Sequence, residues 1–238
     1  SNYELNVIED CAHAIEAKYK NRHCGTFGDI GCFSFYATKN IAIGEGGMAI
    51  SNHEILISKI KLLGLHGLSR DAWRRFESVT KRAYDVVDFG YKMNITDLQS
   101  SIGIVQLKRL DEMRQRRKQI WKFYSDNLSQ INLDLPNLPK NKESKHALHL
   151  FACGLPKNIS RDEFVWKASN EFGVTFGIHY KSIPSYTAYS SLFPKEEFRN
   201  KLPNAFDWGR RTISLSLSAA VSDSDCEKVV LACKSLLK

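Results

Sequence analysis

The first half of the chain alternates short apolar runs with segments of helical periodicity, a pattern typical of a parallel β-sheet with helical crossovers. Residues 6–8 predict a buried strand that delivers Glu9 and Asp10 at its carboxyl end. Residues 31–36 and 47–51 predict two more strands, with the glycine-rich turn GEGG before the last one. Because ligands gather at the carboxyl ends of strands in such sheets, we expect these strand ends to line one crevice.

Helical patterns follow the predicted strands. Residues 54–65 predict one helix, and residues 68–87 are polar and irregular, which is typical of a loop. Residues 96–128 predict one or two long helices that begin with a capping box of Thr96 and Gln99. Four apolar residues recur there at helical spacing and predict an inner face, with the basic residues outside: Leu107, Leu110, Met113 and Ile120.

The second half predicts a small α+β domain. Residues 132–144 are rich in Pro, Asn and Lys and predict a linker. Strands are predicted at residues 146–153, 174–179 and 212–217, together with a helix capped by Ser160 and Glu163 and a last helix from Ser222. We therefore divide the chain into residues 1–128, a large-domain portion with its long connecting helix, and residues 129–238, the small domain.

Composition indicates a globular protein, since 43% of the 238 residues are hydrophobic and 25% are charged. No apolar stretch approaches the length of a membrane span, and the first residues lack the pattern of a secretory leader, so we predict a cytoplasmic location. The six cysteines form no CxxC pair, which favours reduced thiols without disulfides or bound metal: Cys11, Cys24, Cys32, Cys153, Cys226 and Cys233.

The formal net charge of +8 suits an anionic partner, and residues 108–118 (KRLDEMRQRRK) are its densest source. Three interpretations apply to this segment: a solvated helix face, a contact with a nucleotide phosphate or a neighbouring subunit, and a nucleic-acid surface. No base-stacking or groove-reading motif accompanies the basic residues. The solvated face is therefore favoured, and we expect no nucleic-acid partner.

The residue that carries the most chemical information is Lys39, which follows the second predicted strand. A lysine amine can hold an aldehyde as a Schiff base, and a carboxylate such as Asp10 can keep a pyridine nitrogen protonated. That pairing is what an enzyme dependent on pyridoxal 5'-phosphate (PLP) needs. The plainer alternatives are a solvated or phosphate-binding lysine, and an Asp10 that caps a helix beginning at residue 11.

The surroundings of Lys39 favour the PLP interpretation. Ser34, Thr38 and Asn40 supply hydroxyl and amide groups that suit a phosphate, and the glycines of GEGG let backbone pass close to a cofactor.

Three long, correctly ordered motifs extend this picture. They are VIEDCAHAIEAKYKNRHCGTFGDIGCFSFYATKNIAIGEGGMAIS, GYKMNITDLQSSIGIVQLKRLDEM and FGVTFGIHY, followed by the C-terminal helix. With them the chain resembles the DegT family of PLP-dependent nucleotide-sugar aminotransferases over nearly its whole length. The resemblance implies an α/β fold of PLP fold type I, here a partial aspartate-aminotransferase-like large domain plus the small α+β domain.

The resemblance assigns roles to individual residues. Lys39 would be the Schiff-base lysine, Asp10 the pyridinium partner and His13 the group beside the ring. Ser34 would contact the cofactor phosphate, and Asn94 would reach the phosphate of the neighbouring subunit's cofactor. Without the family, His13 is a capped or surface helix residue and Asn94 a turn residue ahead of a helix cap.

The family also places an HY pair near its substrate, which here is His179 and Tyr180. Taken alone, His179 on the apolar run FGIHY is a buried histidine with its hydrogen bonds satisfied. Some relatives carry another histidine shortly after this pair, and here KSIPSY replaces it.

The activity implied by the resemblance is transfer of an amino group, with glutamate as donor, to a keto group of a nucleotide-linked sugar. A related dehydratase branch has His in place of Lys39, so the lysine favours transamination. The family implies a homodimer with its active site at the subunit boundary. A faint similarity of the C-terminal stretch favours UDP-linked 4-keto sugars.

Family members begin with a long segment that has no counterpart upstream of Asp10 here. We therefore expect a fragment of a longer enzyme that binds PLP weakly and turns over poorly alone, and that needs its N-terminal part for full activity. Two alternatives stay open: a non-catalytic fragment that acts as an assembly or regulatory partner, and a basic binding protein.

Overall fold

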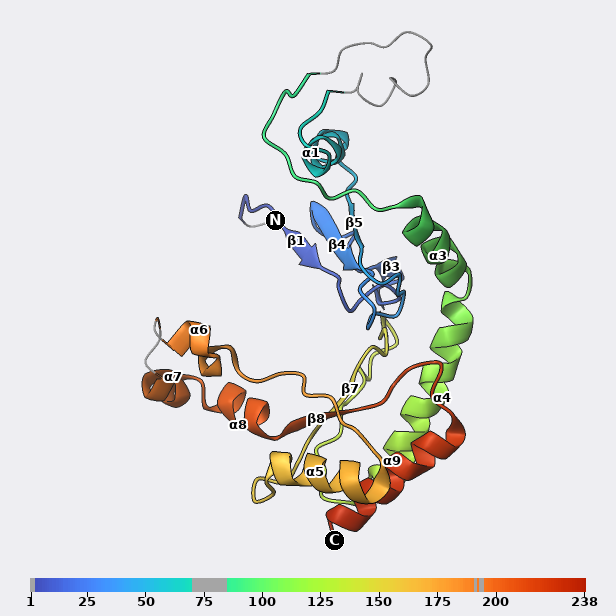
Figure 1. The fold of residues 1–238 in the computed structure, drawn as a ribbon, viewed down its shortest axis with the longest axis vertical. Helices are drawn as coiled ribbons and strands as arrows, with labels where there is room; N and C mark the ends of the chain where they lie inside the picture. The colour runs from blue at the N-terminus through green and yellow to red at the C-terminus, as the bar shows by residue number, and fades with distance from the viewer. Residues whose placement is uncertain (1–2, 70–84, 191, 193–194) are drawn as a thin grey trace. The chain divides into compact units, whose positions relative to one another are not determined.

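The computed structural model describes residues 3–69, 85–190, 192 and 195–238, and Figure 1 labels its elements. The chain forms two compact units by backbone contacts. The first unit comprises Ser1–Leu110 with Pro139–Ala147, and the second comprises Asp111–Leu138 with Leu148–Lys238. Each unit is described by itself below.

The first unit is built on a three-stranded sheet with the order β1-β4-β5. Its strands are β1 (Ile8–Asp10), β4 (Ile30–Ser34) and β5 (Gly47–Ile50), close to the three predicted segments. β1 and β4 pair in parallel, whereas β5 returns antiparallel to β4. The sheet is therefore mixed, with one parallel and one antiparallel pair.

A second small sheet in this unit, of order β3-β2-β6, was not predicted. It joins β2 (Lys18–Tyr19), β3 (Arg22–His23) and β6 (Ser144–Lys145). The turn between β2 and β3 has positive φ at both of its residues, the backbone that a two-residue hairpin requires. Pairing of β6 with β2 ties residues 139–147 to the first unit.

The predicted helices of the first half are confirmed as α1 (Glu54–Gly64), α3 (Asp97–Lys108) and α4 (Leu110–Leu128). The capping box is present: Thr96 Oγ1 accepts from the Gln99 amide, and Gln99 Oε1 accepts from the Thr96 amide at 3.1 Å. Neither α1 nor α3 has a buried residue. Of the loop predicted at residues 68–87, positions 70–84 lie outside the described residues.

The predicted faces of the long helical stretch are wrong at two positions. Arg117, expected on the outer face, is only 3% exposed, and Leu107, expected inside, is 58% exposed. The reason is that α4 packs into the second unit, whereas α3 belongs to the first. The compact units thus divide at Leu110, while the predicted division at residue 128 assigned all of α4 to the large domain.

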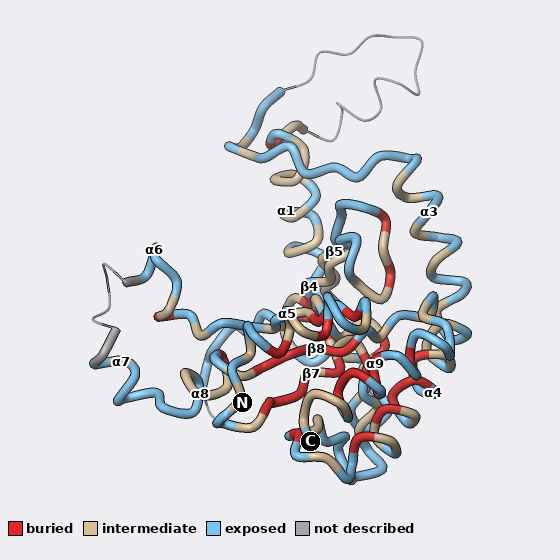
Figure 2. The backbone as a smooth tube through the Cα atoms, turned by 60° about the horizontal axis from the view of Figure 1, so that its bottom comes forward, coloured by how far each residue is buried: buried red, intermediate tan, exposed pale blue. Residues whose placement is uncertain are grey.

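The second unit holds the main hydrophobic core, drawn red in Figure 2 along β7, β8, α4 and α9. Phe151 lies at its centre, with the rings of Trp121 and Tyr124 packed edge-on at centroid distances of 4.6 and 5.4 Å. The unit's main elements are β7 (Phe151–Gly154), antiparallel to β8 (Thr212–Leu215), and the helices α5 (Arg161–Phe172) and α9 (Asp223–Leu236).

Side-chain caps begin α5 and α9 at the predicted residues. Ser160 accepts a hydrogen bond from the Glu163 amide, and Ser222 accepts one from the Asp225 amide. Each cap satisfies an amide donor that the first helical turn would otherwise leave without a partner.

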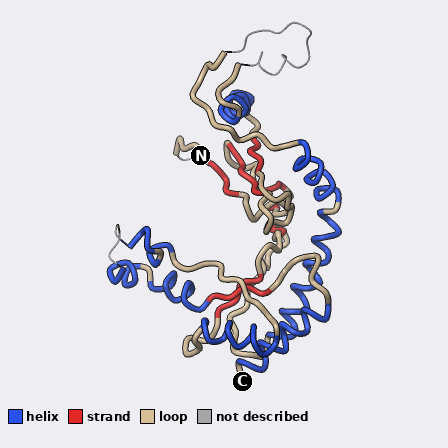
Figure 3. The backbone as a smooth tube through the Cα atoms, viewed as in Figure 1, coloured by secondary structure: helices blue, strands red, loops and turns tan. Residues whose placement is uncertain are grey.

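The segment between α5 and α9 differs most from expectation. The strand predicted at residues 174–179 is reduced to a single bridge between Gly177 and Ser214. Four short helices were not predicted, and Figure 3 shows helical segments in blue after an extended stretch of loop. They are η1 (Ile183–Ser185), α6 (Thr187–Ser190), α7 (Lys195–Lys201) and α8 (Pro203–Arg211).

Two properties of the described chain bear on its chemistry. All six cysteines are free thiols. Among the described residues, no helix combines the length and apolar character that a membrane span requires.

Candidate active site

The parallel pairing of β1 with β4 brings two predicted site residues to one edge of the sheet. Asp10 is the last residue of β1 and lies beside Cys32, and Ser34 is the last residue of β4. Because the strands run in the same direction, both side chains stand at carboxyl ends, where ligands of such sheets bind.

Asp10 does not cap a helix. Residues 11–17 form two successive turns, closed by bonds from the Ala14 amide to the Cys11 carbonyl and from the Ala17 amide to the Ala14 carbonyl, both 2.9 Å. The Oδ1 atom of Asp10 accepts from the Ala12 amide at 3.0 Å, and the side chain is exposed. The helix-cap alternative is therefore wrong. His13 lies in the first of these turns and is also exposed.

Lys39 lies on a loop whose backbone is held at several points. Phe35 donates to the Gly46 carbonyl at 2.8 Å and accepts from the Ile43 amide at 3.0 Å, which closes the base of the loop. The Lys39 amide donates to the Tyr36 carbonyl at 2.9 Å. Ile41 and Ile43 beyond it are buried. The lysine therefore projects from an anchored turn in the same unit as Asp10 and Ser34.

Gly44 is the position in this loop that requires glycine. Its φ of +89° lies in the left-handed region, where a side chain is strained. The turn can therefore reverse the chain toward β5 without displacing the buried isoleucines.

The candidate functional groups of the first unit retain bonding capacity. Considering contacts with other described residues, the amine of Lys39 and the Oδ2 atom of Asp10 have no hydrogen-bond or ion-pair partner. The Ser34 hydroxyl accepts from the Tyr36 amide at 3.3 Å, which leaves its own proton to donate. An amine, a carboxylate and a hydroxyl donor are thus available together.

A buried pair beneath the Lys39 loop was missed at the sequence level. The Asn40 amide group donates to Glu16 Oε2 at 2.7 Å and to the Ala147 carbonyl at 3.0 Å. Glu16 is only 3% exposed. The pair ties the residue after Lys39 to the turns that follow Asp10. The sequence signal was the charged Glu16 within the otherwise small and apolar run CAHAIEA.

Glu9, adjacent to Asp10, has a structural role. Its carboxylate accepts backbone hydrogen bonds from Gly25, Phe27 and Gly28 at 2.6–2.7 Å. Desolvation by burial raises the pKa of Glu9, but the three backbone donors outweigh it and hold the pKa below its ordinary value. Successive side chains of a strand point to opposite faces, so Glu9 fixes the chain leading into β4 while Asp10 remains exposed.

Asn94 belongs to the same unit but to another segment. Met93 just before it donates its amide to the Gly64 carbonyl at 2.8 Å, which attaches this segment to the end of α1. Asn94 is exposed and precedes the Thr96 cap of α3 by two residues.

His179 and Tyr180 lie in the second unit. The Nδ1 atom of His179 is 2.8 Å from the hydroxyl of buried Ser214 on β8, which fixes the imidazole ring. The Tyr180 ring packs edge-on against it, with 4.8 Å between centroids, and is 55% exposed. His179 is therefore hydrogen-bonded, as the plainer interpretation expected, but it is only half-buried, while Tyr180 faces solvent.

Comparison with known proteins gives a consistent result. A family profile described as the DegT/DnrJ/EryC1/StrS aminotransferase family matches residues 1–234. The spore coat polysaccharide biosynthesis protein SpsC of Bacillus subtilis is 38% identical over 241 aligned residues, which cover 100% of this chain and 61% of SpsC.

Solved structures agree with the sequence matches. A Streptococcus pneumoniae protein described as a sugar aminotransferase, in its PMP form, superposes with a TM-score of 0.86 at 28% identity. The match covers 98% of this chain and 59% of that protein. The aminotransferase TlmJ of Streptoalloteichus hindustanus gives a TM-score of 0.82 at 28% identity, with 98% and 59% covered. The chain thus spans about three fifths of the length of these relatives.

We predict that Glu9→Gln loosens the segment before β4. Loss of charge-assisted bonds to three backbone amides should cost about 2 kcal/mol, which corresponds to roughly 30-fold faster hydrogen exchange in residues 24–29 at pH 7. The folded-state pKa is lowered, so this stabilisation is present above the unfolded value of about 4.3 and is lost as pH falls through the folded pKa. The difference between the two proteins should therefore shrink in acid.

The matched control is Glu4→Gln, which removes the same charge from an exposed position. Equal exchange in Glu9→Gln and Glu4→Gln at pH 7 would contradict this role of Glu9.

We also predict that Asn40→Ala frees the Lys39 loop. Removing the amide that bonds Glu16 and the Ala147 carbonyl should lower the free energy of local opening of residues 36–43 by about 1–3 kcal/mol. Asn40→Asp should be worse, because it sets a second carboxylate against Glu16. Hydrogen exchange of that segment measures both effects, with Asn52→Ala at an exposed position as the control. Unchanged exchange in Asn40→Ala would show that the pair does not hold the loop.

Proposed function

Since the chain belongs to the DegT/DnrJ/EryC1/StrS aminotransferase family, we propose that it forms the Lys39-bearing part of a PLP-dependent sugar aminotransferase. The observation that carries the proposal is the set of groups with free bonding capacity in the first unit: the Lys39 amine, the Asp10 carboxylate and the Ser34 hydroxyl. A nucleic-acid or purely structural role gives no reason for this combination.

The residues fit the cofactor. A lysine amine, a carboxylate for a pyridine nitrogen and a hydroxyl for a phosphate are the groups that PLP requires. Solved structures of the S. pneumoniae protein include a PLP form and a PMP form, and that similarity supports the same cofactor here. Lys39, Asp10, Ser34 and His13 would hold it, with Asn94 serving the cofactor of a neighbouring subunit.

Each residue then has a defined task. Lys39 would hold the cofactor covalently through its amine and, once released by an amino donor, would move a proton at Nζ as a general base and acid. When bound, PLP supplies an electron sink for the substrate carbon. Asp10 would keep a proton on the pyridine nitrogen by placing negative charge beside it. The bonds at Phe35, Asn40 and Tyr36 would keep Lys39 within reach.

The finer assignment concerns the substrates. We propose glutamate as the amino donor and a keto group on a nucleotide-linked sugar as the acceptor, near His179 and Tyr180. The naming of SpsC for spore coat polysaccharide biosynthesis supports a sugar-directed reaction. The exposed polar groups of Tyr180 and Lys181 suit hydroxyl-rich ligands.

The working enzyme would need more than this chain. β1 is an edge strand of the described sheet, and Val7 and Ile8 are 49% and 67% exposed. On α3, Leu98 and Ile102 are exposed as well. Exposed apolar faces and open strand edges favour further pairing. We propose that the part of the relatives not matched by this chain covers these surfaces, and that the complete enzyme is a cytoplasmic homodimer.

The test is the half-reaction with the donor. The chain is mixed with PLP, alone and together with the N-terminal segment of SpsC, and the visible absorbance of the cofactor is followed after adding glutamate. We expect a visible absorbance that depends on Lys39 and changes when glutamate is added. This absorbance should be weak for the chain alone and stronger in the mixture. Lys39→Ala should abolish it, and Asp10→Asn should slow the conversion by about 100-fold or more.

Two controls match these variants: Lys61→Ala on α1 and Asp97→Asn on α3, both at exposed positions. Conversion by Lys39→Ala at the wild-type rate would overturn the proposed function. Full conversion by the chain alone would overturn only the proposed need for the additional segment.

A further inference from the structure

The position of His179 is fixed from strand β8. Gly177 and Ser214 exchange two backbone hydrogen bonds, of 3.0 Å from the Gly177 amide and 2.8 Å from the Ser214 amide. In such an antiparallel pairing the residue two positions after Gly177 lies opposite the residue two positions before Ser214, so His179 faces Thr212. The Thr212 hydroxyl donates to the His179 carbonyl at 3.4 Å, and the Ser214 hydroxyl contacts the ring. Two side chains of β8 thus hold one histidine.

Gly177 leaves the space that the imidazole ring occupies. A Cβ atom at this position would lie 2.7 Å from the Cε1 atom of His179 and 3.2 Å from its Nδ1 atom. Both distances are shorter than ordinary van der Waals contact, so a side chain at residue 177 would displace the ring. The absence of a side chain therefore lets the ring reach the Ser214 hydroxyl, which lies 2.8 Å from Nδ1.

The burial of Ser214 decides the direction of this hydrogen bond. Ser214 is 4% exposed, and among the described residues its hydroxyl has no partner other than the His179 ring. If Nδ1 carried the ring proton and donated it to the serine oxygen, the hydroxyl proton would be buried without an acceptor, which is destabilising. If the hydroxyl donates to Nδ1, both groups are satisfied. Nδ1 is therefore the acceptor, and the proton of the neutral imidazole is on Nε2.

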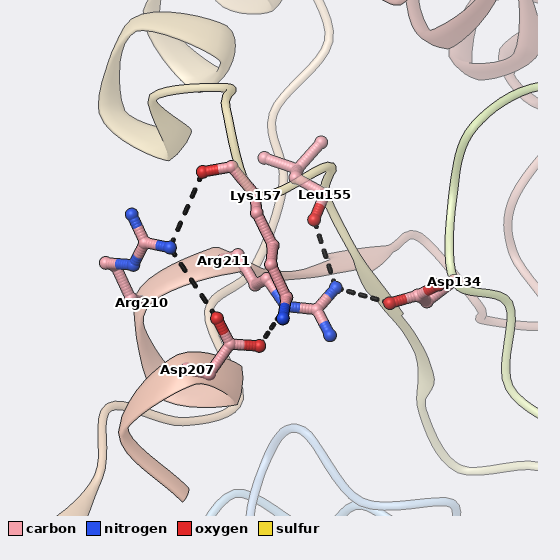
Figure 4. Close-up of polar contacts among 6 residues, drawn as sticks. All are labelled: Asp134, Leu155, Lys157, Asp207, Arg210 and Arg211. Atoms are coloured by element: carbon pink, nitrogen blue, oxygen red, sulfur yellow. Dashed lines mark hydrogen bonds and ion pairs between the residues drawn. The ribbon is translucent and has the colours of Figure 1, made fainter. Parts of the chain in front are cut away.

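The strand that carries these hydroxyls is anchored where it begins. Figure 4 shows Arg211, the residue just before β8, joined to Asp134, to Asp207 and to the Leu155 carbonyl. The Arg211 Nε atom donates to Asp207 Oδ2 at 2.7 Å, and its Nη1 atom donates to the Leu155 carbonyl at 3.0 Å. A guanidinium holds its donors in a fixed plane, so these three contacts restrain the backbone at the start of the strand.

We propose that Ser214 is a positioning residue that fixes His179 in the tautomer with its proton on Nε2. His179 would then offer its substrate a hydrogen-bond donor, and the matching group on the substrate is an acceptor oxygen, such as a carbonyl or hydroxyl oxygen. The other tautomer would present an acceptor to the same oxygen and repel it. The contact of His179 with a substrate rests on the proposed function, whereas the tautomer rests on the hydrogen bonds of the second unit alone.

The test reads the tautomer directly by nuclear magnetic resonance. The full 238-residue chain is labelled with ¹⁵N-histidine, and long-range ¹H–¹⁵N spectra are recorded at about pH 8.5, where a histidine with the ordinary pKa of about 6.5 is neutral. The spectrum of the His179→Gln variant identifies the His179 signals. We expect an Nδ1 atom without a proton and an Nε2 atom with one in the unaltered chain, and a mixture of both tautomers in Ser214→Ala.

Two further variants separate the hydroxyl from general packing. Ser216→Ala is the matched control, because it removes a hydroxyl from an exposed position of the same segment, and it should leave the His179 signals unchanged. Gly177→Ala keeps the Ser214 hydroxyl but displaces the ring, so it should also mix the tautomers. A proton on Nδ1 in the unaltered chain would overturn the inference. Identical His179 signals in Ser214→Ala and in the unaltered chain would overturn it as well.

Turnover supplies the second readout. The chain mixed with the N-terminal segment of SpsC, PLP and glutamate is given a UDP-linked 4-keto-6-deoxyhexose as the acceptor. We expect Ser214→Ala to raise the KM for this sugar about 10-fold, while the rate of the half-reaction with glutamate changes less than about 2-fold. An unchanged KM for the sugar would overturn the role of Ser214 toward the substrate.

Borohydride trapping of PLP on the same preparations separates this inference from the proposed function. Trapping at Lys39 together with a His179 tautomer that does not depend on Ser214 would overturn the inference alone. A tautomer that depends on Ser214, without trapping at Lys39, would overturn the proposed function and support the positioning of His179.

Discussion

The parallel pairing of β1 with β4 is the constraint on which the candidate active site depends. It aligns Asp10 with Cys32 and so brings the carboxyl ends of two strands, with Asp10 and Ser34, to one edge. The Glu9 carboxylate secures this arrangement from the other face by binding three backbone amides of the connection between the strands. Glu9 thus serves the structure, while Asp10 stays available for the proposed chemistry, because neighbouring residues of a strand face opposite ways.

The two units differ in how they bury apolar surface. The second unit surrounds Phe151 with a continuous core, whereas in the first unit α1 and α3 have no buried residue and β1 is an edge strand. The chain spans about three fifths of its relatives' length. The Lys39 loop belongs to the first unit. Hydrogen bonds at Phe35 and Asn40 hold that loop, together with the buried Ile41 and Ile43.

Much of this arrangement could be predicted from the sequence because its determinants are local. The three strands near Lys39, the Thr96 cap and the Ser160 and Ser222 caps each follow from a few consecutive residues. Long-range contacts could not be read in this way. Arg117 is buried because α4 packs on the second unit, and Asn40 meets Glu16 and Ala147 from distant parts of the chain. The short helices α6, α7 and α8 have 4, 7 and 9 residues, fewer than the window of about 11–18 over which helical periodicity is recognised, and were missed for that reason.

The central claim is that Lys39 carries the cofactor. The direct measurement is borohydride reduction of the chain after incubation with PLP, followed by peptide mapping of the fixed label. The account predicts one dominant label on the peptide that contains Lys39. The Asn40→Ala variant should carry less of this label, because its Lys39 loop is looser. A label distributed among exposed lysines, with no preference for Lys39, would contradict the account.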